Sequence, residues 1–85
     1  MKINGKLYKG TAILLEKQVD VGEHEGSYQD RLEKGLVALC HELSVEVPLW
    51  LTKNTREFVN YRRTSFNADQ FFNPVIFERF EIKVE

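Results

Sequence analysis

Cysteine, proline and long apolar runs are all scarce in this chain of 85 residues. Cys40 is the only cysteine, so no disulfide can form within the chain and a disulfide-stapled secreted scaffold is excluded. No unbroken apolar run approaches the ~20 residues that a membrane-spanning helix needs. Residues 1–6 also lack the apolar core of a signal peptide. We therefore expect a soluble cytoplasmic protein without a membrane segment.

Charge of one sign is also lacking, because the net charge of the whole chain is −1. Such a balance gives no general attraction to nucleic acid or to an anionic membrane. One segment is an exception to this balance of charge. Residues 53–66 carry Lys53, Arg56, Arg62 and Arg63 against Glu57 alone. The positive charge is therefore local.

Apolar and charged residues are present in ordinary globular proportions, at 42% and 29%. The length suits one domain, covering residues 1–85, and is too short for two separate cores. Six Phe, three Tyr and one Trp are many for this length, and their large buried areas help a small domain to offset the entropy of ordering its chain.

The N-terminal part predicts a β-hairpin. Residues 1–7 alternate between apolar and polar side chains, which is the period of a half-buried strand. We place the turn at Lys9-Gly10, followed by a second strand over residues 11–21. This second strand has apolar side chains on both faces, so we expect it to be central and partly covered on both sides.

The firmest prediction is a long amphipathic helix after the polar loop at residues 22–26. Ser27 followed by Asp30 matches a capping box, which fixes the first turn of a helix. Gly35 on the apolar side indicates a close approach to the sheet. The apolar residues recur at helical spacing over about four turns: Tyr28, Leu32, Leu36, Leu39, Cys40 and Leu43.

The C-terminal half is less regular. Residues 45–52 alternate, but Pro48 lacks an N–H, so the stretch is an edge strand or an extended crossover. We expect Asn54 to cap a short helix over residues 55–61, and one further helical turn over residues 67–72. The last strand changes phase between residues 77 and 80. Either a β-bulge lies at Glu78-Arg79, or residues 75 and 77 belong to the preceding loop.

These elements predict an α+β fold with an N-terminal hairpin, a long helix, one or two short helices and a C-terminal strand. The sheet is expected to be mixed, with three or four strands, in a β-grasp-like arrangement. In that arrangement the first and last strands lie side by side and parallel in the middle of the sheet. The comparison concerns the fold and implies no function.

The basic, aromatic segment at residues 53–66 is the best candidate for a binding site. Arginine forms bidentate bonds to carboxylate or phosphate, and aromatic faces stack on bases or guanidinium groups. On a continued helix Arg56 and Arg63 would share a face. A structural role is the alternative, in which the aromatics dock the short helix and the arginines pair with local carboxylates. The candidate binding residues are Trp50, Lys53, Arg56, Tyr61, Arg62 and Arg63.

The stretch from Trp50 to Phe58, with the run from Tyr61 to Phe66, resembles a segment in a family of small uncharacterised proteins from anaerobic Gram-positive bacteria. The resemblance runs along the length of the chain. It implies a cytoplasmic location and implies nothing about activity or ligand.

No catalytic or metal-binding group stands out. Cys40 and His41 are neighbours on the predicted helix, where side chains point about 100° apart, so they do not form a nucleophile and its base. Cys40 falls on the apolar face and reads as an inert core thiol. Glu23, His24 and Glu25 read as a solvated loop. We expect no catalytic residue, metal or cofactor, and no enzyme.

Two binding functions remain. The first is a small protein-interaction or adaptor module that uses Trp50 and residues 53–66, with a protein partner or a second copy as its target. A free sheet edge is a further surface for pairing. The alternative is nucleic-acid or phosphate binding through the same basic segment, whose four charges are few and lack an RNA-recognition or helix-turn-helix signature.

Overall fold

The computed structural model describes residues 1–22 and 26–85. The first half contains β1 (Lys2–Lys9), β2 (Ala12–Asp20) and α1 (Tyr28–Leu43). The second half contains α2 (Thr52–Tyr61), β3 (Arg63–Asn67), the short 3-10 helix η1 (Ala68–Gln70) and β4 (Arg79–Val84). The predicted α+β class and N-terminal hairpin are confirmed. No helix in these ranges is long and apolar enough to cross a membrane.

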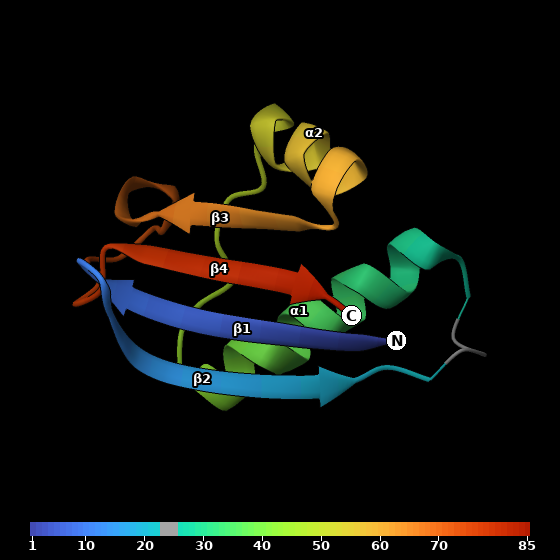
Figure 1. Cartoon of the computed structure of the whole chain (residues 1–85), viewed down its shortest axis with the longest axis horizontal. Coiled ribbons are helices and arrows are strands. Elements are labelled where there is room, and N and C mark those ends of the chain that lie inside the picture. The colour runs from blue at the N-terminus through green and yellow to red at the C-terminus, as the bar shows by residue number, and fades with distance from the viewer. Residues whose placement is uncertain (23–25) are drawn as a thin grey trace.

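The strands form one sheet in the order β2-β1-β4-β3, and every neighbouring pair is antiparallel (Figure 1). The first and last strands lie side by side in the middle, as expected, but they run in opposite directions. The mixed sheet is therefore wrong and the β-grasp arrangement is not confirmed. The reason is β3, which the sequence reading missed. One extra strand between α2 and β4 reverses the direction in which the last strand runs.

The hairpin turns at Gly10 and Thr11, one residue later than the predicted Lys9-Gly10, and Gly10 has a φ of 60°. A β-bulge follows, because Leu7 pairs with Leu15 whereas Tyr8 pairs with Ile13. Beyond the bulge, Ile13 shares a face with Tyr8, away from α1. β2 is an edge strand, not a central one, and its residues from 12 to 18 are all exposed.

α1 lies across one face of the sheet, behind the strands in Figure 1. Its capping box is confirmed, because Asp30 N–H donates to Ser27 Oγ at 3.2 Å and Ser27 N–H donates to Asp30 Oδ2 at 3.4 Å. The close approach at Gly35 is also confirmed. A Cβ there would lie 2.3 Å from Ile3 Cδ1 and 2.9 Å from Val21 Cγ2, so only glycine lets the helix pack this near.

The core fills the space between α1 and the sheet. No helix lies over the opposite face of the described sheet, which carries mostly polar side chains (Figure 1). The large apolar side chains that are buried most completely come from β1, α1, β3 and β4, and they are Ile3, Leu39, Phe66, Phe80 and Ile82.

Residues 45–51 form an irregular crossover, which decides between the two readings of that stretch. α2 begins three residues earlier than predicted, with Leu51 as its cap, so Asn54 is not the cap but the third residue of the helix. One helical turn does occur at residues 68–70. β4 begins at Arg79, so residues 75 and 77 belong to the loop and the bulge predicted at Glu78-Arg79 is wrong.

Candidate functional site

The candidate segment at residues 53–66 is split between two elements and the residue that joins them. Lys53 and Arg56 lie on α2, Arg62 is the connecting residue, and Arg63 begins β3. Because α2 ends at Tyr61, Arg56 and Arg63 do not share a helix face, as they would on a continued helix. Arg56 precedes Arg62 by six residues, so it lies about 9 Å further back along the helix axis.

Buried polar side chains hold α2 against β3. Asn54 is 0% exposed, and its Nδ2 donates to Thr64 Oγ1 at 2.8 Å and to the Ser65 carbonyl at 2.9 Å. Its Oδ1 accepts from Leu51 N–H at 2.9 Å and from Gln70 Nε2 at 3.0 Å. Both N–H donors and both oxygen lone pairs of this amide are therefore occupied. Asn54 therefore has a structural role.

The network extends beyond Asn54 on both sides. Gln70 Nε2 also donates to the Leu49 carbonyl at 2.9 Å, and Gln70 Oε1 accepts from Asn67 N–H at 3.0 Å. Thr64 Oγ1 donates to Glu57 Oε1 at 2.6 Å. Sequence reasoning missed these contacts. Asn54 and Gln70 each lie in a polar stretch of the sequence, so nothing local indicated that their side chains are buried.

The aromatic residues of the segment are mostly packed. Phe58 and Phe66 are buried, and the Trp50 ring lies 6.1 Å from the first and 5.7 Å from the second. Trp50 Nε1 donates to Thr55 Oγ1 at 2.8 Å, which satisfies the indole N–H. Trp50 is half-buried, so only part of its ring faces solvent. Tyr61 is the exposed aromatic of the group, at 67%.

Tyr61, Arg62, Arg63 and Lys83 form what we term the basic surface. Tyr61 and Arg63 line one shallow hollow of about 220 Å³, together with Glu57 and Glu81. Lys83 is the cross-strand partner of Arg63, and both are exposed. Among the described residues, no carboxylate oxygen lies within 4.0 Å of the charged nitrogens of Arg62, Arg63 or Lys83.

Arg62 has a left-handed backbone, with a φ of 56°, where it ends α2. Its N–H donates to the Phe58 carbonyl at 2.8 Å, which closes the last turn of the helix. A side chain in this conformation is strained relative to glycine. Ser44, which ends α1, has the same conformation with a φ of 58°.

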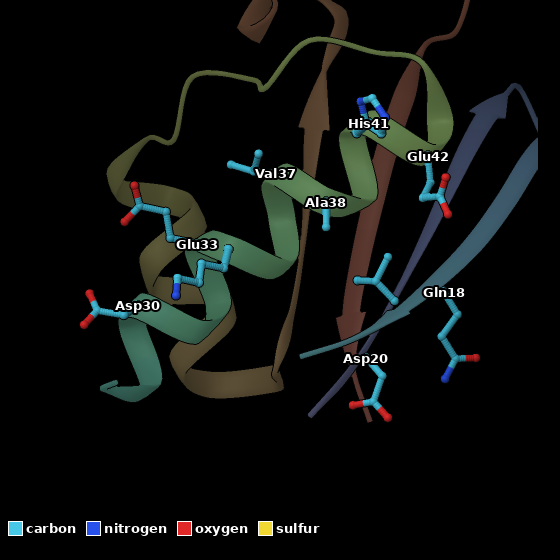
Figure 2. Close-up of a pocket in the computed structure, with 10 residues that line it drawn as sticks. Gln18, Asp20, Asp30, Glu33, Val37, Ala38, His41 and Glu42 are labelled. Carbon is cyan, nitrogen blue, oxygen red and sulfur yellow. The ribbon is translucent and has the colours of Figure 1, made fainter. Parts of the chain in front are cut away.

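A second surface, which sequence reasoning did not identify, lies between α1 and β2 (Figure 2). It is an open groove of about 1100 Å³. Ala38 points from α1 into the space beside β2, and Gln18 and Asp20 line the opposite side (Figure 2). Four carboxylates line the groove against a single lysine, Lys34, and they are Asp20, Asp30, Glu33 and Glu42.

Cys40 and His41, which the sequence places next to each other, lie in different environments. Cys40 is buried, and burial raises the pKa of its thiol to about 12, so it stays protonated at neutral pH. His41 beside it is exposed. Glu23, His24 and Glu25 lie outside the described residues. Within the described ranges, no three His, Cys, Asp or Glu side chains are grouped as metal ligands.

Comparisons with protein-family models, with curated proteins and with solved structures find no match to this chain.

Proposed function

We propose that this chain is a small, non-catalytic protein-interaction module that binds an acidic segment of a partner protein through the basic surface. One observation carries the proposal. Arg62, Arg63 and Lys83 are exposed beside one another, with no described carboxylate within ion-pair distance. We retain a cytoplasmic location as part of the proposal, because a single buried thiol suits a reducing compartment.

The pairing of Arg63 with Lys83 supports an anionic partner. Like charges directly opposite each other on neighbouring strands destabilise a sheet. A carboxylate bound between them removes that repulsion and accepts charge-assisted hydrogen bonds from the guanidinium group. Tyr61 adds rigid aromatic area at the rim, which is typical of protein interfaces. The other candidate residues, Trp50, Lys53 and Arg56, are not part of the basic surface.

Nucleic-acid binding is the second candidate, and it is supported by the exposed cations and by Tyr61. The open face of the sheet argues against a phosphate track, because its charges alternate in sign. Lys6 lies 4.0 Å from Glu16 on one side and pairs across strands with Glu81 on the other. Cations interrupted by carboxylates do not follow a polyanionic backbone well.

Fluorescence anisotropy separates these functions. A short labelled peptide rich in glutamate is titrated with the protein, in parallel with single-stranded and duplex DNA at low salt. We expect the peptide to bind more tightly than either DNA. The variants Arg62→Gly and Lys83→Ala should each weaken peptide binding by about tenfold, equivalent to about 1.4 kcal/mol. Lys9→Ala, an exposed lysine at the hairpin turn, is the matched control and should have no effect.

Arg62→Gly is informative because glycine suits the left-handed backbone at this position. The variant removes the charge without destabilising the fold, so lost binding cannot be attributed to unfolding. No binding of the acidic peptide contradicts the proposal. Tighter binding of DNA, with an affinity that falls steeply with salt, establishes the nucleic-acid alternative instead.

A further inference from the structure

The free edge of β2 has a defined set of outward-facing backbone groups. Val21 N–H donates to the Met1 carbonyl at 2.8 Å, and the Met1 ammonium donates to the Val21 carbonyl at 3.1 Å. These two residues therefore form a hydrogen-bonded antiparallel pair. Hydrogen-bonded pairs alternate along the ladder, so Val19, Lys17 and Leu15 also bond inward to β1.

It follows that Glu16, Gln18 and Asp20 direct their N–H and C=O groups away from the sheet. No hydrogen bond joins these backbone groups to another residue in the described part of the chain. An unpaired row of this kind is a template for a further strand.

A strand added at this edge would lie against the flank of α1. Val19 faces α1, and Ala38 of the helix points into the same groove (Figure 2). Val37, which is 50% exposed, also lines the groove. These side chains form an apolar floor beside the unpaired backbone. The rim is acidic, with Glu33 and Glu42 on the helix. The groove therefore combines unpaired backbone groups, apolar area and negative charge.

A second copy of this chain is poorly suited to the edge. Two-fold antiparallel pairing centred on Glu16 places that carboxylate opposite its own copy. Pairing centred on Lys17 does the same for the ammonium group, and pairing centred on Gln18 places Glu16 opposite Asp20. Like charges directly opposite destabilise each of these registers. The bulge at Leu14 blocks extension beyond them, and registers centred nearer Asp20 pair only a few residues.

We infer that the groove between α1 and β2 binds an extended, basic segment of a partner protein as a fifth strand along the edge of β2. This site is separate from the basic surface and does not rest on the function proposed for it. The complementary segment alternates, with lysine or arginine near the carboxylates of the rim and apolar side chains over Val37 and Ala38. Opposite Lys17 it carries a neutral or acidic residue.

Hydrogen exchange read by NMR tests the mode of binding directly. The probe is a short peptide that alternates lysine and valine, with an alternating glutamate and valine peptide as its control. On adding the basic peptide, we expect exchange to slow by about tenfold or more at the amides of Gln18 and Asp20. The amide of Val19 already bonds to β1, so its exchange should change little.

Two variants test the residues. Gln18→Pro removes an outward N–H while leaving every bond from β2 to β1 in place, and proline is tolerated on edge strands. It should weaken binding of the basic peptide by about tenfold. The double variant Glu33→Lys/Glu42→Lys alters only exposed side chains and tests the rim even if Gln18→Pro does not fold. Its matched control, Asp69→Lys/Glu85→Lys, makes the same change of charge outside the groove and should bind normally.

Four results overturn the inference: no binding of the basic peptide, equal slowing of exchange at Gln18 and Asp20 by the acidic peptide, binding of the basic peptide without slowed exchange at these amides, and unchanged binding of the basic peptide by both groove variants. Concentration-dependent dimerisation that slows exchange at the same amides without peptide would show that a second copy is the occupant, and would also overturn it. None of these results bears on the basic surface, because the glutamate-rich probe and the Arg62→Gly variant report on that site alone.

Discussion

The two edges of this four-stranded sheet are treated in opposite ways. At β3, α2 lies along the edge (Figure 1), and two of the outward-facing backbone groups are bonded by side chains. The Ser65 carbonyl accepts from Asn54, and Asn67 N–H donates to Gln70. At β2, the corresponding groups of Gln18 and Asp20 have no partner among the described residues. One edge is closed within the chain, and the other is open.

Within the segment that was predicted to bind a partner, this difference distinguishes residues with a structural role from residues that are available for binding. Much of residues 50–66 closes the β3 edge, which accounts for the buried Phe58 and Phe66 and the packed Trp50. The arginines are left outside that packing. At β2 the edge is limited by the bulge and by charged side chains, among them Lys17 on the face that points towards α1. Such features discourage unregulated pairing without covering the edge.

The largest expected loss of stability comes from removing the hydrogen bonds that hold α2 against the β3 edge. Asn54→Ala leaves the partners of a fully buried amide unsatisfied, including Thr64 and Gln70. We expect it to lower the free energy of unfolding by about 3 kcal/mol. Urea denaturation measures the loss. Asn60→Ala, an exposed asparagine on the same helix, is the control and should change stability by less than about 0.5 kcal/mol. A loss below about 1 kcal/mol at Asn54 would show that the network does not hold this edge.

The second effect concerns how closely α1 lies to the sheet beside the open edge. Gly35→Ala places a Cβ against Ile3 and Val21, so we expect a loss of about 2 kcal/mol despite the better helix propensity of alanine. The exposed position 38 should show the opposite preference. There alanine is more stable than glycine, so Ala38→Gly should lower the free energy of unfolding by about 1 kcal/mol. Thermal unfolding of both variants tests this contrast. Stabilisation by Gly35→Ala would contradict the close packing.

The third effect is a gain of stability at both helix ends. Ser44→Gly and Arg62→Gly relieve side chains in left-handed backbone conformations, so each should add about 0.5–1 kcal/mol to the free energy of unfolding. Only Arg62→Gly should also weaken binding of the glutamate-rich peptide. Equal binding losses in both variants would mean that the effect does not come from the arginine charge.

The smallest effect on stability is expected at Lys17, where a substitution should instead change self-association. Lys17→Val should change the free energy of unfolding by less than about 0.5 kcal/mol. It removes a charge that disfavours strand pairing at the open edge, so self-association should appear at high protein concentration. Light scattering after size-exclusion chromatography measures it. Lys17→Glu keeps a charge at that position and should remain monomeric. A monomeric Lys17→Val would mean that the charge does not limit pairing.

The sequence was sufficient where local patterns decide the structure. The helix at residues 28–43 followed from its periodicity and the Ser27 capping box, and the hairpin turn followed from Lys9-Gly10. Apolar side chains on both faces suggested a central second strand, but the bulge at Leu14 produces the same pattern in an exposed edge.

The arrangement of the C-terminal half was not readable, because it depends on pairing between distant residues. β3 is only five residues long and follows α2 after one connecting residue, Arg62. The spacing of Arg56 and Arg63 was considered on a continued helix, and the strand was missed. Missing β3 also gave the wrong direction for β4. The candidate cations were identified from composition, whereas Lys83 joins them only through the strand register. The acidic groove needs α1 and β2 side by side, which no local motif indicates.

Native-state hydrogen exchange of the free protein tests the contrast between the two edges most directly. The amide of Asn67 is bonded by Gln70, so we predict that it exchanges about 100-fold or more slowly than in an unfolded chain. The amide of Gln18 points outward and should exchange within about tenfold of the unfolded rate. Protection at Gln18 as strong as at the neighbouring Val19 would show that the β2 edge is covered, and would contradict the contrast.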